Sequence, residues 1–459
     1  MSPEEFRKRG HEMVDWVADY LAGVANYPVN STVKPGSIRA GLPEKAPEQP
    51  EPFEDVVRDL NEIIMPGITH WQSPNWFSYF PANSSGPSLL GEMVASGLGV
   101  QGMLWSTSPA ATELETVVVD WMVDLLGLPP TWKTTGPGGG VIQMSASDSA
   151  HVAMVTAREL ARARARPDQM VVYASDQTHS SVEKGARIAG FTNLRIVPTD
   201  GTFAMDPAAF ERQVAADRAN GLVPVFVAVT VGTTATTAID PVRTVATIAG
   251  REDIWVHVDA AYAGSAMVCP EHRHHQDGLE LVDSYTFNPH KWMFTNFDCN
   301  LYFVANRKPL IDAMSILPPY LRNEATLSGQ VIDYRDWHVP LGRRFRALKL
   351  WFVLRHYGAE GIRHHIREHI ALAQDLAGRL DSDPRFELVA PHPFSLVVFR
   401  HVGGNETTKQ LAVALNATGN VSVTPTTLGD VEAIRVSIGQ TNTTTRHVDS
   451  LLTLIDKLG

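Results

Sequence analysis

The feature of this sequence that most restricts its fold is a regular alternation between residues 86 and 305. Segments with helical periodicity alternate there with short apolar runs rich in β-branched residues. These runs are 170–173, 194–197, 223–230, 254–258, 285–287 and 301–304. Strands separated by helices usually run parallel, so the pattern predicts an α/β fold, a mainly parallel sheet with helices on both faces. Ligands of such sheets bind at the carboxyl ends of the strands.

The N-terminal part is expected to form an arm. Ser2, Pro3 and Glu5 form a capping box that starts an amphipathic helix. Five prolines between residues 35 and 52 then break regular structure, and a second helix follows near 53–64. Because such an arm often lies on a partner subunit, we expect residues 1–85 to contact a second copy of the chain.

The C-terminal part indicates a small separate domain. A long helical region at about 343–380 precedes strand-like runs that alternate with helices, at 386–389, 396–399, 421–423 and 434–438. This mixture predicts an α+β domain over 361–459. Residues 86–360 then form the large domain.

Composition and charge exclude several kinds of partner. The chain has 50 acidic and 39 basic residues, and its net charge of -11 repels a phosphate backbone, so nucleic acid is not expected. Its longest uncharged stretch, 219–239, contains Pro224 and five threonines and fits a buried strand and loop better than a membrane span. Two cysteines are too few for a disulfide framework, and no export signal opens the chain, so we expect a cytoplasmic protein.

The segment 287–292 carries the most informative residue. Lys291 comes just after a buried strand and is flanked by His290 and Trp292. A desolvated amine loses part of its preference for the charged form and becomes a better nucleophile toward carbonyl groups, as in Schiff-base lysines. Taken alone, Lys291 also fits a lysine whose stem lies on apolar surface while its amine reaches water.

A carboxylate at the end of another strand supports the first interpretation. The run 254–258 ends at Asp259, and small residues follow it. Asp259 either caps the next helix or shares one end of the sheet with Lys291, which lies 32 residues later, one strand–helix–strand unit away. Pyridoxal phosphate requires the second arrangement, because a buried carboxylate keeps its ring nitrogen protonated.

Two further motifs suit the same cofactor. Three glycines at 138–140 lead through a short strand to Ser147 before a helix, where backbone N–H groups, the hydroxyl and the helix dipole can hold a phosphate. His179 follows the run 170–173, so its flat imidazole can stack on a cofactor ring at the same sheet edge. A lone histidine is more often structural, and only its expected position beside the lysine and the aspartate favours a functional role.

Taken together, these motifs resemble the group II pyridoxal phosphate decarboxylases, and most closely the aromatic L-amino acid decarboxylases. The resemblance covers nearly the whole chain, at 69–71 with 79–81, 108–110 with 113–115, 138–147, 176–181, 257–264, 288–292, 296–299 and 337–344. It implies the aspartate-aminotransferase fold (fold type I), with a mainly parallel seven-stranded sheet and a helical arm that completes a homodimer.

The resemblance also implies roles for individual residues. Lys291 would hold pyridoxal 5'-phosphate covalently, Asp259 would pair with its ring nitrogen, and His179 would stack on its ring. Further cofactor contacts are expected from Ala146, Ser147, Thr234, Ala261, Asn288 and His290. The substrate pocket is expected from Trp71, Tyr79, Phe80, Pro81, Ala82, His179 and Gly342, with Met103 and Leu104 entering the pocket of the partner subunit.

The segment after Pro318 resembles the mobile catalytic loop of the family. We expect Tyr320 to protonate the α-carbon of the substrate, while the closed loop keeps water and oxygen away. Without the resemblance, Tyr320 also fits an ordinary surface loop.

The resemblance implies decarboxylation of an aromatic L-amino acid to its amine. An alternative within the family is an aldehyde synthase, in which oxygen captures the carbanion; Tyr320 and His179 both have the decarboxylase identity. An alternative of another class is a cofactor-free scaffold with the same fold. Gly342 leaves room for an indole or catechol ring, but Ala82, Met103 and Met144 depart from common family residues. Tryptophan, 5-hydroxytryptophan, dopa, phenylalanine and tyrosine therefore stay open as substrates.

Two other features are not assigned to the site. The histidines at 272–275 and 364–369 lack the carboxylate or cysteine partners of a zinc site, so no metal is expected. Arg435 is interpreted as a structural or supporting residue, because a salt bridge to the departing carboxylate would hinder decarboxylation.

Overall fold

The computed structural model describes residues 1–316 and 324–459, except the side chain of Leu327. Its centre is a seven-stranded sheet with the order β1-β7-β6-β5-β4-β2-β3. The strands are β1 Gly139–Gln143, β2 Met170–Ser175, β3 Asn193–Val197, β4 Val223–Thr230, β5 Trp255–Asp259, β6 Ser284–Phe287 and β7 Asn300–Val304. Strand β7 is antiparallel to both neighbours, and the other pairs are parallel. The prediction of a mainly parallel seven-stranded sheet is therefore confirmed.

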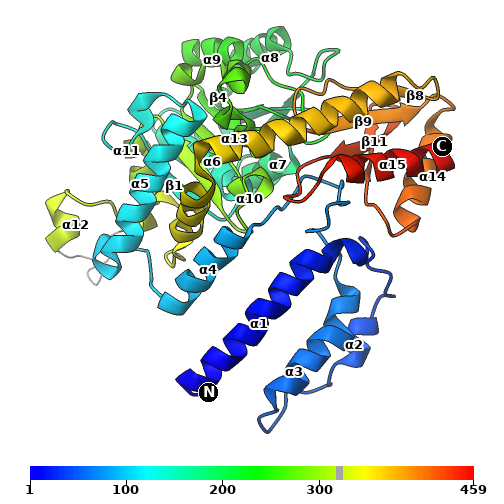
Figure 1. Cartoon of the computed structure of the whole chain (residues 1–459). Helices are drawn as coiled ribbons and strands as arrows, with labels where there is room; N and C mark the ends of the chain where they lie inside the picture. Colours follow the sequence, from blue (N-terminus) through cyan, green and yellow to red (C-terminus); the bar gives the residue numbers. More distant parts are fainter. Residues whose placement is uncertain (317–323) are drawn as a thin grey trace.

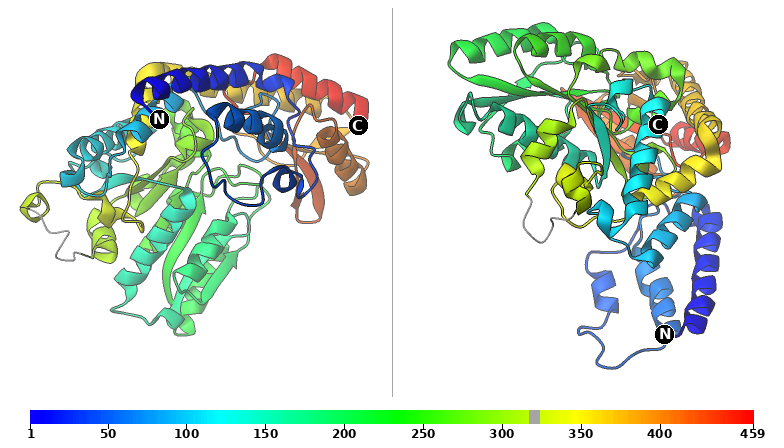
Figure 2. Two further views of the ribbon diagram at one scale, coloured as in Figure 1. Left: turned by 90° about the horizontal axis from the view of Figure 1, so that it is seen from below. Right: turned by 90° about the vertical axis from the view of Figure 1, so that its left-hand side faces the viewer.

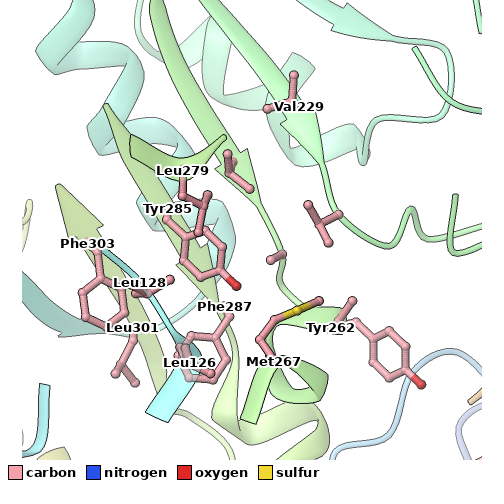
Figure 3. Close-up of a cluster of buried hydrophobic side chains, with 14 of the residues drawn as sticks. Leu126, Leu128, Val229, Tyr262, Met267, Leu279, Tyr285, Phe287, Leu301 and Phe303 are labelled. Atoms are coloured by element: carbon pink, nitrogen blue, oxygen red, sulfur yellow. The ribbon is translucent and has the colours of Figure 1, made fainter. Parts of the chain in front are cut away.

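Helices cover both faces of this sheet and bury an apolar core against each (Figure 1). Figure 3 shows part of the first core, where Tyr285, Phe287 and Phe303 of neighbouring strands lie together. The helices around these cores are α5 Pro109–Leu126, α6 Ala146–Ala161, α7 Ser180–Ile188, α8 Pro207–Ala219, α9 Val242–Arg251 and α11 Arg307–Met314. Because both faces are covered, the central strands β2, β4 and β5 are almost entirely buried and mainly apolar, without regular polar alternation.

A second, antiparallel sheet with the order β10-β11-β9-β8 lies near the C-terminus. Its strands are β8 Phe386–Leu388, β9 Leu396–His401, β10 Thr424–Leu428 and β11 Val431–Ser437. The helices of this part of the chain are α13 Arg346–Asp381, α14 Asn405–Ala417 and α15 Thr445–Leu458. The prediction of a strand at 421–423 is wrong. Val421 and Val423 are buried, but Ser422 between them makes only an isolated bridge, to Trp76, and the strand begins at Thr424.

The N-terminal segment projects from the body of the molecule (Figures 1 and 2). It contains α1 Pro3–Gly23, α2 Ser37–Gly41 and α3 Phe53–Asp59. The expectation that the prolines exclude regular structure is wrong for α2, which fits between Pro35 and Pro43. None of the residues of α1, which is described along its whole length, is buried. An apolar groove between α1 and α3 is lined by Met13, Phe53, Val56 and Leu60 among others.

Helix α4 (Gly86–Leu98) follows this arm in the chain, and its side chains Leu90, Met93 and Leu98 are about half exposed. Two short helices complete the fold, α10 Pro289–Trp292 and α12 Glu324–Ser328. In the part of the chain that the structure describes, no helix has both the length and the apolar character needed to cross a membrane.

Candidate active site

A cavity of about 200 Å³ opens at the carboxyl ends of β4, β5 and β6. Its walls come from Phe80, Ser145, Ala146, Ser147, His179, Ser181, Thr230, Gly232, Thr234, Asp259, Ala261, Tyr262, Asn288, His290 and Lys291. The structure thus brings together all nine residues that the sequence predicts as cofactor contacts. They come from five separate segments of the chain, which share one edge of the sheet because parallel strands end there.

Lys291 lies on α10, directly after β6, and its amine is 5.2 Å from the ring centre of Phe80. Among the described residues, none donates a hydrogen bond to the amine or forms an ion pair with it. Loss of hydration lowers the pKa of Lys291; the Asp259 carboxylate opposes this effect and the Arg435 guanidinium adds to it. A larger fraction of the amine is therefore neutral and nucleophilic than in an exposed lysine.

Asp259 is the last residue of β5 and is 5% exposed. Its Oδ1 accepts a hydrogen bond from the backbone N–H of Ala261 at 2.9 Å. Its Oδ2 has no hydrogen-bond donor within the described residues and lies at the cavity. This oxygen is available to accept a hydrogen bond from a protonated nitrogen of a ligand.

His179 lies just before α7 and caps it. Its Nδ1 accepts a hydrogen bond from the backbone N–H of Ser181 at 3.2 Å and lies 2.8 Å from the Ser181 hydroxyl. Because Nδ1 is an acceptor, the ring proton is on Nε2. Burial lowers the pKa of His179, so the imidazole is a neutral, flat wall of the cavity.

His290 is the second histidine of the cavity, next to Lys291 in the chain. Its Nδ1 accepts a hydrogen bond from the backbone N–H of Cys299 at 2.9 Å. Burial, assisted by the nearby lysine, lowers the pKa of His290 to about 3. It therefore contributes no positive charge to the site at neutral pH.

The start of α6 closes another side of the cavity. Ser145 caps the helix by accepting a hydrogen bond from the backbone N–H of Asp148 at 3.3 Å. Ala146 and Ser147 follow in the first turn, where helical N–H groups have no acceptor within the helix. These groups and the helix dipole favour an anion at this end of the cavity.

The three glycines at 138–140 do not form a turn at the cavity. Gly139 and Gly140 are the first residues of β1 and pair with Val304 and Phe303, and none of the three glycines lines the cavity. A Cβ atom on Gly140 would lie 2.6 Å from the Phe303 ring. The glycines therefore allow close packing at the far end of β1, about one strand length from the first turn of α6.

The predicted substrate residues separate into two groups. Phe80 lines the cavity, where its ring stacks on Tyr262 at 3.9 Å. Trp71 and Tyr79 stack on each other at 5.6 Å and are 37% and 57% exposed. In the described parts of the chain, these two aromatics and Pro81 and Ala82 do not line the cavity. Tyr79 and Pro81 flank Phe80 in the sequence.

Met103, Leu104 and Gly342 do not line the cavity either. The Met103 carbonyl accepts a hydrogen bond from the Arg335 backbone N–H at 3.1 Å, and Leu104 is 4% exposed. The position of a Cβ atom on Gly342 is 3.3 Å from the side-chain nitrogen of Gln101, so part of the room at Gly342 is taken by that amide. Tyr320 lies outside the described residues.

Residues 35–402 match a family described as the pyridoxal-dependent decarboxylase conserved domain. The chain belongs to the pyridoxal-dependent decarboxylase family. Aromatic-L-amino-acid decarboxylase of Rattus norvegicus is 43% identical over 98% of this chain and 96% of its own. Phenylacetaldehyde synthase of Arabidopsis thaliana is 44% identical over 100% of this chain and 96% of its own. A crystal structure of Oryza sativa TDC with PLP and tryptamine superposes with a TM-score of 0.98, at 40% identity over 100% of this chain and 98% of that chain.

The cavity suits the cofactor of the pyridoxal-dependent decarboxylases. It offers an amine of lowered pKa for a carbonyl group, a free carboxylate oxygen for a ring nitrogen, a flat imidazole for a ring face, and a helix start for a phosphate. The predicted family, fold type, cofactor and carboxy-lyase class are confirmed by the match and by these relatives.

The sequence does not predict several residues of this decarboxylase cavity. They are Ser145, Ser181, Thr230, Gly232 and Tyr262. Thr230 had a usable signal, since it ends β4 as Asp259 ends β5, and the two residues are paired in the sheet. Tyr262 had none, because a buried aromatic residue in a sequence is most simply a core residue.

Proposed function

We propose that this enzyme decarboxylates an aromatic L-amino acid to the corresponding arylalkylamine. The observation that carries the proposal is the placement of Lys291, Asp259 and His179 in one cavity walled by the aromatic rings of Phe80 and Tyr262. The names of the relatives, an aromatic-L-amino-acid decarboxylase among them, support an aromatic side chain on the substrate.

The residues of the cavity have separate tasks in this reaction. When bound, pyridoxal phosphate supplies a conjugated ring that accepts the electron pair left by the departing carbon dioxide. Lys291 would hold the cofactor through its amine, and Asp259 Oδ2 would hold a proton at the ring nitrogen. His179 would stack on the ring, while Ala146, Ser147 and Asn288 would bind the phosphate. Thr234, Ala261 and His290 complete the walls.

Tyr320 protonates the α-carbon after carbon dioxide has left. This proton decides the product, because a carbanion that is not protonated is open to attack by oxygen. An aldehyde synthase is the second candidate, supported by the 44% identity to a phenylacetaldehyde synthase. The identities of Tyr320 and His179 favour the amine.

The substrate pocket is completed in a homodimer. Trp71, Tyr79, Phe80, Pro81, Ala82 and Gly342 contribute from one subunit, and Met103 and Leu104 enter the pocket of the other. The projecting arm supports this assembly, since α1 buries no residue and the groove between α1 and α3 is apolar. The half-exposed apolar side chains of α4 support it further.

The cytoplasm is the compartment that we propose for this enzyme. The two buried free thiols, Cys269 and Cys299, suit its reducing conditions.

The experiment that tests this function measures amine, aldehyde and hydrogen peroxide from the same reaction. Tryptophan, 5-hydroxytryptophan, dopa, phenylalanine and tyrosine are supplied separately and then in competition, with histidine and glutamate as non-matching amino acids. We expect one amine per carbon dioxide from an aromatic substrate, with indole or catechol substrates preferred and little peroxide. Stoichiometric peroxide and aldehyde would establish the synthase instead, and turnover of glutamate alone would contradict the aromatic substrate.

A further inference from the structure

A buried amide lies directly beneath the cavity. Asn300 is the first residue of β7 and is fully buried. Its Nδ2 lies 2.7 Å from Asn288 Oδ1, 2.8 Å from Thr286 Oγ1 and 3.0 Å from the Phe287 carbonyl oxygen, and its two N–H hydrogens are shared among these three acceptors. All three partners belong to β6 and the residue that follows it.

The chemistry of the partners fixes the orientation of this amide. The Phe287 carbonyl can only accept, and the Thr286 hydroxyl already donates its proton to the Leu301 carbonyl. The Asn300 atom that faces both groups must therefore be its nitrogen. It follows that Asn288 turns its oxygen toward Asn300.

The same contact decides what Asn288 offers to the cavity. Since its Oδ1 is held by Asn300, its Nδ2 is left to face the space that Asn288 lines. Within residues 1–316 and 324–459, no acceptor for this Nδ2 is present. A ligand anion would find an N–H donor there and not a repelling carbonyl oxygen.

Asn300 is also linked to the opposite wall of the cavity. Its Oδ1 accepts a hydrogen bond from Ser149 Oγ at 2.6 Å, and Ser149 lies one turn into α6. That first turn contains Ala146 and Ser147. One buried amide thus joins the two parts of the wall that meet the anion, the start of α6 and Asn288.

We propose that Asn300 is a positioning residue for the phosphate of the cofactor. It does not line the cavity; it holds the Asn288 amide as a donor and fixes that donor relative to the start of α6. This inference depends on the cofactor of the family and not on which amino acid is decarboxylated.

The test compares the binding of two probes to the enzyme freed of cofactor: pyridoxal 5'-phosphate and pyridoxal, which lacks the phosphate. Both react with Lys291, so the phosphate contacts are isolated by one ratio, the dissociation constant of pyridoxal divided by that of pyridoxal phosphate. In Asn300→Leu, similar in size and uncharged, we expect pyridoxal phosphate to bind about tenfold more weakly or worse, because Asn288 is no longer held. Pyridoxal should bind within about twofold of the wild type.

Two more variants keep the test decisive. Asn300→Ser introduces a smaller side chain and serves if the leucine variant does not fold. We expect the same fall in the ratio for this variant. The matched control is Asn416→Asp, since Asn416 also donates to a carbonyl, that of Val423 at 3.0 Å, but lies in the C-terminal domain. A wild-type ratio in the Asn300 variants, or an equal fall of the ratio in the control, would overturn the proposal.

Discussion

Lys291 and Arg435 hold their cationic groups near the same aromatic ring, at 5.2 Å and 5.3 Å from the centre of Phe80. Arg435 is 3% exposed, and among the described residues its hydrogen bonds go only to the carbonyls of Ala235 and Tyr79. In the described residues it has no acidic partner. A buried, uncompensated guanidinium beside Lys291 opposes a second positive charge there, so Arg435 acts on the reactive amine through its charge.

Replacing Arg435 by methionine should therefore raise the pKa of Lys291, by about one pH unit. The Asp259 carboxylate, which favours the charged amine, would then act without opposition from Arg435. At neutral pH less of the amine is neutral, so the cofactor-free enzyme should combine with pyridoxal phosphate more slowly. The pH dependence of that association rate measures the shift. Arg435→Lys keeps the charge and should keep the wild-type midpoint; the same midpoint in Arg435→Met would contradict the prediction.

Replacing Tyr320 by phenylalanine should change the product and not the binding of cofactor. Loss of a positioned acid slows protonation by about 10²-fold to 10⁴-fold, which gives oxygen time to react. We expect amine formation to fall and peroxide and aldehyde to rise, while the visible absorbance of the bound cofactor stays unchanged. Parallel assays of amine and peroxide measure this partition. An amine yield equal to that of the wild type would remove Tyr320 from the reaction.

Replacing Glu115 by glutamine should destabilise the fold. Glu115 and Arg343 form an ion pair at 2.6 Å with side chains only 4% and 2% exposed, so the variant leaves a buried guanidinium without its counter-ion. We expect a loss of about 3–5 kcal/mol in the free energy of unfolding. Urea denaturation measures it, and Glu183→Gln, which breaks the exposed pair with Arg187, should change little. Equal urea midpoints for the two variants would show that the buried pair is not important.

Replacing His369 by glutamine should make stability less sensitive to acid. His369 is 2% exposed, and its Nδ1 accepts a hydrogen bond from Trp292 Nε1 at 2.9 Å, a role that a glutamine oxygen can take over. Burial lowers the pKa of His369 to about 3, from an ordinary value of 6.5. Between these values the unfolded chain binds more protons than the folded one, so this histidine makes stability fall as the pH falls.

The glutamine variant removes that contribution. Below the ordinary histidine pKa, the slope of unfolding free energy against pH should decrease by up to about 1.4 kcal/mol per pH unit. Urea unfolding at several pH values between neutrality and mild acid measures the slope. A slope unchanged from the wild type would mean that His369 is protonated to the same extent in both states.

Much of the site could be predicted because the chemistry lies at strand ends. Lys291 and Asp259 each follow a buried apolar run, and the carboxyl ends of parallel strands meet at one edge, so their proximity follows from the alternation alone. The glycines at 138–140 misled for a related reason. A glycine-rich stretch near a helix start is compatible both with an anion site and with close packing, and only the side chains of Phe303 and Trp337 distinguish the two.

The sequence by itself determined the α/β class, the cofactor and the residues at the ends of the strands, because these depend on local patterns of a few residues each. The tertiary structure decided which distant residues support them. Arg435 reaches the Tyr79 carbonyl across 356 positions of the chain, and Asn300 reaches Ser149 across 151. Such contacts depend on how whole elements pack against one another, and no local pattern in the sequence specifies that packing.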